Sequence, residues 1–148
     1  MTGKKVLKGT YCILIYLKED SRITIGKLGM VDFPKGYYVY VGSALNSLEA
    51  RVKRHLSSNK KLHWHIDYFL TSENTEIVEV LYTISDDRWE CYLAQEIAKN
   101  STGISRFGCS DCKCDSHLLY FKNFGDLERY CYNAFDVLNL IPEKYEPV

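Results

Sequence analysis

The segment Tyr11–Leu17, with the sequence Tyr-Cys-Ile-Leu-Ile-Tyr-Leu, is the longest uninterrupted apolar run near the start of the chain. Its β-branched and aromatic side chains favour a β-strand. The run is much shorter than the roughly 20 residues that a membrane-spanning helix requires, and residues 1–8 do not have the pattern of a signal peptide. We therefore expect a soluble cytoplasmic protein with no membrane partner.

The rest of the chain alternates between strand and helix patterns. Short apolar runs predict four more strands, at residues 22–25, 37–41, 76–83 and 117–121. Apolar residues at helical spacing predict four helices, at residues 45–56, 62–70, 89–97 and 127–138. Asn46 lies three residues before Glu49, an arrangement that is typical of a capping box at the start of the first helix. The polar residues 18–21 join the first two strands in a turn, and the glycines that follow residue 25 predict an irregular stretch.

Length and composition limit the domain organisation. The chain has 148 residues, of which 46% are hydrophobic, so it can bury one substantial core but is too short for two independent domains. Together with the order of elements, this predicts an α/β fold: a single compact domain with a small, mainly antiparallel sheet flanked by helices.

The charge pattern leaves two interpretations open. The formal net charge is zero, which argues against a nucleic-acid partner because such modules are usually basic. However, residues 1–74 contain 12 basic and 6 acidic residues, a charge of +6, and residues 75–148 carry −6. This asymmetry is consistent with a basic face for phosphates beside an acidic face that holds a metal. The alternative is that folding disperses these charges over the surface.

The six cysteines have no secretory signal beside them, so we expect reduced thiols rather than disulfides. Cys12, Cys91 and Cys131 lie in apolar periodic segments, where cysteine commonly behaves as a small buried hydrophobe. We expect all three to belong to the core.

A second group of cysteines has the composition of a zinc site. Cys109, Cys112, Cys114 and His117 supply the ligand types of a closed tetrahedral site. Zinc sites usually combine two ligand pairs from separated segments, and the Cys-x-Cys step is less usual. The spacing therefore argues against zinc and favours buried or loop thiols.

Two short motifs and two single residues occur in a characteristic order. Residues 9–11 read Gly-Thr-Tyr on the first strand, and residues 40–42 read Tyr-Val-Gly on a later strand. Arg51 follows on the next helix and Glu90 on a later one. This order resembles the GIY-YIG nuclease superfamily. Within the two motifs, the chain departs from the family signature at Thr10 and Val41, which are both isoleucine in the family name. The family often carries an asparagine after the glutamate helix, and no residue of this chain is assigned to it.

Within this superfamily, the chain resembles an archaeal branch of uncharacterised GIY-YIG-like domain proteins. This resemblance rests on Gly-Tyr-Tyr-Val-Tyr-Val-Gly-Ser-Ala at 36–44, His-Trp-His-Ile-Asp-Tyr at 63–68 and the cysteine block near 109. The resemblance covers most of the chain. It implies a single nuclease domain over 1–148, in which 101–148 is a C-terminal extension packed on the rest.

The resemblance implies an endonuclease that hydrolyses DNA phosphodiester bonds with Mg²⁺ or Mn²⁺, in DNA repair or recombination. Tyr11 inherits the role of general base, and Tyr40 belongs to the same catalytic group. A phenol has a reference pKa of about 10, so Tyr11 needs nearby positive charge or an acidified water. Arg51 suits the phosphate, because a guanidinium stays charged and forms paired hydrogen bonds. Glu90 suits the metal, as an oxygen ligand.

Further basic residues surround Arg51. His55 lies four residues after Arg51 and shares its helix face, so that both side chains can contact one phosphate. Lys53, Arg54, Lys60 and Lys61 are candidate contacts to a nucleic-acid backbone. An ordinary solvated surface is the alternative for these residues.

Three polar residues of the following segment, His63, His65 and Asp67, make a poor metal site on a helix, because His65 faces away from the other two. We expect them to be structural, with Asp67 orienting a histidine.

Two other functional classes fit the same residues. The chain can be a non-catalytic nucleic-acid-binding module that keeps the fold and the basic helix, or an accessory module of a DNA-repair enzyme. In both, Tyr11 and Tyr40 would be an aromatic pair that packs in the sheet. Cleavage of DNA distinguishes the enzyme from either module.

Overall fold

The strand that contains the first motif lies at the centre of the molecule. The computed structural model describes residues 7–108 and 114–146. A six-stranded sheet has the order β6-β7-β4-β1-β5-β8, and every pairing among these strands is antiparallel. In that order the strands are β6 (Thr102–Gly103), β7 (Leu118–Phe121), β4 (Gly36–Ala44), β1 (Gly9–Leu17), β5 (Thr75–Ile84) and β8 (Glu143–Lys144).

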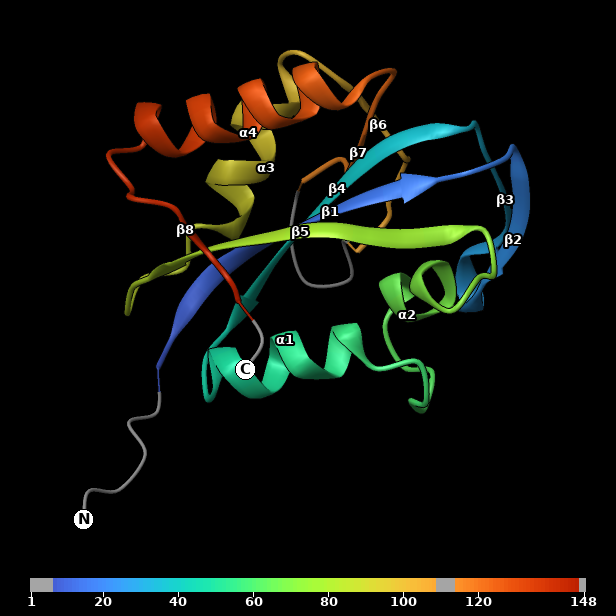
Figure 1. Ribbon diagram of the computed structural model, residues 1–148, viewed down its shortest axis with the longest axis horizontal. Coiled ribbons are helices and arrows are strands. Elements are labelled where there is room, and N and C mark those ends of the chain that lie inside the picture. Colours follow the sequence, from blue (N-terminus) through green and yellow to red (C-terminus); the bar gives the residue numbers. More distant parts are fainter. Residues whose placement is uncertain (1–6, 109–113, 147–148) are drawn as a thin grey trace.

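Four helices cover the two faces of this sheet. The helices α1 (Leu48–Leu56) and α2 (His65–Leu70) lie on one face, and α3 (Glu90–Ala98) and α4 (Phe124–Val137) lie on the other (Figure 1). The predicted fold, an α/β domain with a small, mainly antiparallel sheet flanked by helices, is confirmed. No helix in the described part of the chain is both long enough and apolar enough to cross a membrane.

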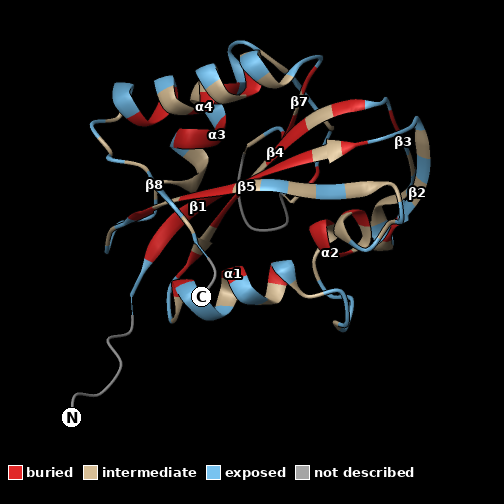
Figure 2. Cartoon of the chain, viewed as in Figure 1, coloured by how far each residue is buried: buried red, intermediate tan, exposed pale blue. Residues whose placement is uncertain are grey.

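The covered faces explain why the first apolar run has no polar alternation. Successive side chains of a strand point to opposite faces. Ile13 and Ile15 belong to the core under α1 and α2, whereas Cys12 and Leu14 belong to the core under α3 and α4. Figure 2 shows β1 buried along most of its length between helices whose outer surfaces are exposed. A strand buried on both faces reads as a continuous apolar run.

The hairpin beside this sheet differs from the sequence-based prediction. The predicted strand at 22–25 is β2 (Ser21–Ile25), but it pairs with β3 (Gly29–Phe33) in a separate two-stranded sheet and not with β1. The stretch expected to be irregular contains β3. Gly26 and Gly29, with φ of 46° and 85°, shape the tight connection between the two strands, because glycine adopts positive φ without steric cost.

The start of α1 determines which of its side chains face the sheet. Ser47, and not the predicted Asn46, is the N-cap, and its hydroxyl oxygen accepts a hydrogen bond from the Ala50 N–H at 3.1 Å. Leu48, Val52 and His55 form the buried face of the helix. Arg51 lies beside this face, and its side chain reaches Ser43 on β4, which is paired with Thr10 of the first motif.

Candidate active site

A cavity of about 300 Å³ lies where both motifs meet four other segments. Its walls come from β1, β4, α1, the segment before α2, the first turn of α3 and the segment that leads into β7. The lining residues are Tyr11, Tyr40, Gly42, Ser43, Arg51, Trp64, Arg88, Glu90, Cys91, Gly108 and His117. The hydroxyl oxygen of Ser43 is buried with no hydrogen-bond partner among the described residues. A buried polar atom on a cavity wall favours a polar ligand.

Glycine is required where the two motifs cross. Tyr11 on β1 is paired with Gly42 on β4. A Cβ atom at Gly42 would lie 2.5 Å from the Tyr11 hydroxyl oxygen and 2.6 Å from its ring carbon Cζ. Gly42 therefore gives the Tyr11 side chain room to cross β4 and reach the cavity. On the other side of β1, a Cβ atom at Gly9 would clash with the carbonyl oxygen of Thr83.

The Tyr11 hydroxyl is hydrogen bonded to the Nε2 atom of His55 at 2.7 Å. Tyr11 is 1% exposed and His55 is 2% exposed. Burial raises the pKa of Tyr11, with Glu90 adding to the rise and Arg51 opposing it. Burial, helped by the positive charges of Lys60 and Arg51, lowers the pKa of His55 to about 3. Both groups are therefore neutral near pH 7, and one proton lies between them.

Arg51 is held by a carbonyl group and an aromatic ring. Its Nη1 atom donates to the Ser43 carbonyl oxygen at 3.0 Å, and its guanidinium lies 4.5 Å from the centre of the Trp64 ring. Arg54 lies 4.3 Å from the same ring. These cation–π contacts fix the indole while most of the Arg51 donors remain available for an anion.

Asp67 fixes this corner of the molecule. Its buried carboxylate accepts two hydrogen bonds from Arg54, at 2.8 and 2.9 Å, and two from the backbone N–H groups of His63 and Trp64. Burial opposes the charge, but these donors outweigh burial and lower the pKa of Asp67. The expectation that Asp67 orients a histidine side chain is wrong, because its partners are an arginine and the backbone.

Glu90 is the first residue of α3, where the helix dipole favours a negative charge. Its Oε2 atom lies 3.7 Å from the Nδ1 atom of His117. The preceding residue, Trp89, donates its backbone N–H to the hydroxyl oxygen of Thr10 at 3.4 Å. Thr10, a departure from the motif, thus connects the start of α3 to β1 next to Tyr11.

Comparison with known proteins gives one match. The model of a family described as "Domain of unknown function DUF123" matches residues 10–140. The chain belongs to this family. Neither a curated protein nor a solved structure matches it. The chemistry of this DUF123 domain therefore has to be argued from its own residues.

Four of the predicted catalytic residues of the DUF123 domain line the same cavity, although they are far apart in sequence: Tyr11, Tyr40, Arg51 and Glu90. The fifth, His55, lies behind the cavity wall and reaches it through Tyr11. Burial raises the pKa of Tyr40, as it does for Tyr11, so this phenol is also neutral near pH 7.

The other predicted nucleic-acid contacts lie outside the cavity lining. Arg54 is engaged by Asp67 and by the carbonyl oxygen of Lys61. Lys60 donates to the carbonyl oxygen of His55 at 2.7 Å. Lys53 forms an exposed ion pair with Glu49 at 2.9 Å, and Lys61 is exposed. Arg54 and Lys60 therefore stabilise the wall of the cavity, whereas Lys53 and Lys61 remain candidate surface contacts.

Sequence reasoning missed six residues that line the cavity of this DUF123 domain: Ser43, Trp64, Arg88, Cys91, Gly108 and His117. Trp64 lies inside one of the segments that carried the family resemblance, and Arg88 precedes Glu90 by two positions. Those positions were the available signals, but neither specifies which way a side chain points.

The cysteines divide differently from the prediction. Cys12 and Cys131 are buried in the core, as predicted. Cys91 is not a core residue, because it is only half-buried and lines the cavity. It lies beside Cys114 and His117, and the three ligand atoms are all within 4.8 Å of one another. The predicted group also included Cys109 and Cys112, which lie outside the described residues.

Proposed function

We propose that this DUF123 domain is a divergent GIY-YIG nuclease, a metal-dependent endonuclease that hydrolyses DNA phosphodiester bonds in repair or recombination in the cytoplasm. The observation that carries the proposal is the meeting of Tyr11, Arg51 and Glu90 in one cavity. Hydrolysis needs an activated water, a cation for the phosphoryl oxygens and a metal ligand. Each of these requirements has a candidate residue at this site.

Arg51 would bind the scissile phosphate. Its position against Trp64 restricts the guanidinium, so that less conformational entropy is lost when phosphate binds. Arg88 adds a second positive charge on the cavity wall. The Ser43 hydroxyl, which has no hydrogen-bond partner in the part of the chain that the structure describes, can donate a hydrogen bond to a phosphoryl oxygen. Together, these groups would stabilise the dianionic transition state of phosphodiester hydrolysis, and they favour a negatively charged ligand over a neutral one.

Tyr11 and His55 would handle the proton of the attacking water. When the Tyr11 O–H donates to His55 Nε2, the phenol oxygen keeps two lone pairs. Arg51 can donate a hydrogen bond to one of them, and the other can accept a hydrogen bond from that water. As the water attacks phosphorus and the bond from phosphorus to the leaving oxygen breaks, one proton of the water passes to the Tyr11 oxygen while the Tyr11 proton passes to His55. The leaving oxygen takes up a proton from solvent, and the proton on His55 returns to solvent by the same route. Tyr11 thereby remains neutral, consistent with the raised pKa of its buried phenol.

Glu90 would hold the metal ion. It is the only carboxylate among the described residues that line the cavity, and 24% of its side chain is exposed. Mg²⁺ is commonly held by one or two carboxylates together with waters and substrate phosphates, so this donor set fits. When bound, the ion would polarise a phosphoryl oxygen and make a coordinated water more acidic. His117, on the other side of Glu90, restricts the orientation of the carboxylate.

One observation favours a second candidate, a non-catalytic nucleic-acid-binding or accessory module of a DNA-repair enzyme. Tyr11 is almost completely buried, and its partner His55 is a weak base. Both features also suit a packing role. In that case the cavity would bind a phosphate through Arg51 and Arg88 without cleaving the substrate.

A cleavage screen separates the two candidates. The purified chain is incubated with duplex, single-stranded, branched and mismatched DNA, first with Mg²⁺ or Mn²⁺ and then with chelator. The nuclease proposal predicts metal-dependent cleavage of at least one substrate and loss of cleavage in Glu90→Ala. Binding without cleavage of any substrate would favour the module. Cleavage that persists in Glu90→Ala would indicate a contaminating nuclease.

A further inference from the structure

Three potential metal ligands meet where α3 approaches the strand β7. Cys91 comes from the first turn of α3, and Cys114 and His117 come from the segment that ends at β7. The sulfur atom of Cys91 lies 3.7 Å from Nε2 of His117, and all three ligand atoms lie within 4.8 Å of one another. Around a tetrahedral zinc ion, neighbouring sulfur and nitrogen ligands are roughly 3.5–3.8 Å apart. The three ligand atoms are therefore near the spacing of a tetrahedral site, which a fourth ligand would complete.

We propose that Cys91, Cys114 and His117 bind a zinc ion that fastens the start of α3 to the approach to β7. The sequence-based argument against zinc was that its candidate ligands came from one short segment. Cys91 removes this objection, because it supplies a ligand from a different element. Two thiolates and an imidazole favour zinc over magnesium, which prefers oxygen ligands.

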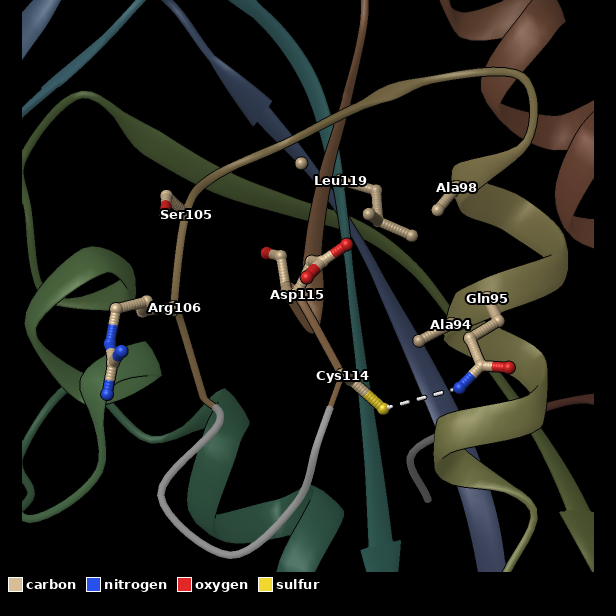
Figure 3. A pocket seen from close by; sticks show the side chains of 10 residues that line it. Ala94, Gln95, Ala98, Ser105, Arg106, Cys114, Asp115 and Leu119 are labelled. Carbon is tan, nitrogen blue, oxygen red and sulfur yellow. Dashed lines mark hydrogen bonds between the residues drawn. The ribbon is translucent and has the colours of Figure 1, made fainter.

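The surroundings of the ligands match those of a metal site. Cys91 and Gln95 are four residues apart and so share one face of α3. The amide nitrogen of Gln95 donates to the sulfur of Cys114 at 3.9 Å (Figure 3). Hydrogen bonds of this kind to a coordinating thiolate are typical of the residues around a zinc ion. Figure 3 shows the Cys114 sulfur directed toward this face of α3.

His117 is held in the orientation that the site needs. Its backbone N–H donates to the Phe107 carbonyl oxygen at 2.8 Å, and its own carbonyl accepts from the Val41 N–H at 3.0 Å. The ring presents Nε2 to Cys91 and Nδ1 to Glu90. A carboxylate behind a ligating histidine fixes the tautomer and strengthens the ligand. Glu90 would therefore interact with the zinc ion only through His117 and would not be a zinc ligand.

The test measures zinc directly and does not depend on nuclease activity. The full chain is purified without chelator or a metal-affinity column, loaded with zinc, passed through gel filtration and submitted to elemental analysis. We expect one zinc ion per chain. Loading with cobalt should give a thiolate-to-cobalt charge-transfer band.

Variants locate the ion. In competition with a chromophoric chelator, Cys91→Ser should weaken zinc binding by more than about 100-fold, because outer-shell changes alone cost about 10–100-fold. Gln95→Ala, at an exposed position, should weaken binding about 10-fold and leave the fold intact. Cys131→Ala, which removes a buried thiol elsewhere, is the matched control and should keep the wild-type affinity.

Three results would overturn the proposal. The first is a wild-type chain that holds no zinc after loading. The second is a cobalt-loaded chain without a thiolate band. The third is zinc bound as tightly by Cys91→Ser as by the wild type, which would place the ion at other ligands. Because Gln95→Ala and the wild-type spectrum do not depend on Cys91→Ser folding, the proposal stays testable if that variant is unstable.

Discussion

Tyr11 and His55 form a buried pair in which the environment opposes charge on either partner. The hydroxyl oxygen and Nε2 are 2.7 Å apart, and Nδ1 of His55 has no hydrogen-bond partner among the described residues. A charged His55 would therefore be stabilised by little except the carboxylate of Asp67, while Lys60 and Arg51 repel it. The pair could transfer a proton during a reaction, but both partners are neutral before the reaction begins.

The low pKa of His55 predicts a specific loss of stability in acid. In the unfolded chain this histidine takes up a proton near pH 6.5, whereas in the folded chain it does so only near pH 3. Between these values the unfolded state binds more protons, so the free energy of unfolding decreases by up to about 1.4 kcal/mol for each pH unit of acidification. His55→Gln should flatten the dependence by close to one proton, measured by urea unfolding between about pH 4 and about pH 6.

The matched control for this experiment is His63→Gln, at an exposed histidine of the neighbouring segment. It should retain the wild-type dependence of stability on pH. If His55→Gln and the wild type lose stability equally on acidification, His55 is not buried in its neutral form as described.

The close approach of Gly42 to Tyr11 leads to a second prediction. A Cβ atom there would lie 2.5 Å from the Tyr11 hydroxyl oxygen, so Gly42→Ala must displace the ring or the strand. We expect destabilisation of about 1–3 kcal/mol, as for other overpacked cores. Gly125→Ala in α4 is the control, because a Cβ atom there would lie 3.6 Å from its nearest neighbour, the Oδ1 atom of Asn123. This substitution should leave the free energy of unfolding unchanged or raise it by up to about 1 kcal/mol. Urea unfolding of both variants provides the comparison, and a Gly42→Ala chain as stable as the wild type would contradict the close approach.

At the scale of elements, Asp67 joins α1 to the start of α2. Its side chain is fully buried and accepts four hydrogen bonds from Arg54, His63 and Trp64. Asp67→Ala should lower the free energy of unfolding by about 3–5 kcal/mol, because it leaves the Arg54 charge without its partner.

An exposed ion pair of the same residue types provides the control for Asp67. Arg22 and Asp32 form a 2.7 Å pair, but the side chains are 65% and 72% exposed. Asp32→Ala should change the free energy of unfolding much less than Asp67→Ala does, because solvent screens an exposed ion pair. Chemical denaturation of both variants measures the difference. Equal effects of the two substitutions would show that burial of Asp67 does not contribute as described.

The elements with strong periodicity were predictable, and the hairpin was not. The runs that predicted strands at 76–83 and 117–121 correspond to β5 and β7, and the helix predicted at 127–138 corresponds to α4. By contrast, β3 (Gly29–Phe33) is short and begins at a glycine, features that also indicate a loop. Pairing of β2 with β3 in place of β1 depends on long-range packing, which local patterns do not encode.

At the scale of the whole molecule, the two oppositely charged halves of the sequence do not form separate bodies. The strand β4 comes from the basic half and β5 and β7 from the acidic half, yet all three belong to one sheet. The cavity likewise combines Arg51 from the first half with Arg88 and Glu90 from the second. The net charges of the two halves therefore indicated that the site contains basic and acidic residues, but they did not indicate where it lies.

Because the cavity combines residues from distant parts of the sequence, only some of its residues could be predicted from the sequence. The order of the two motifs, Arg51 and Glu90 predicted four of the lining residues through a family resemblance. Local spacing could not bring Cys91 to His117, or place Trp64 against Arg51, because both contacts join different elements. Contacts of this kind are determined by packing of the complete fold.

If DNA binds over the cavity, its affinity should decrease steeply with added salt, since phosphate contacts release counterions. Arg88→Ala and Lys53→Ala should each reduce the slope of log affinity against log salt by about 1. Lys99→Ala, which removes an exposed lysine paired with Glu96, is the control and should leave the slope unchanged. Binding titrations at several salt concentrations give the slopes, and an affinity independent of salt would contradict a basic contact surface.

In the proposed nuclease, Tyr11 moves a proton during cleavage. Tyr11→Phe isolates this role, because it removes one hydroxyl and preserves the buried ring. Single-turnover cleavage is measured beside equilibrium DNA binding for the wild type and this variant. We expect the cleavage rate to decrease by roughly 10²–10⁴-fold while the dissociation constant for DNA stays nearly unchanged. A folded Tyr11→Phe chain that cleaves DNA at the wild-type rate would contradict the claim and leave Tyr11 as a packing residue.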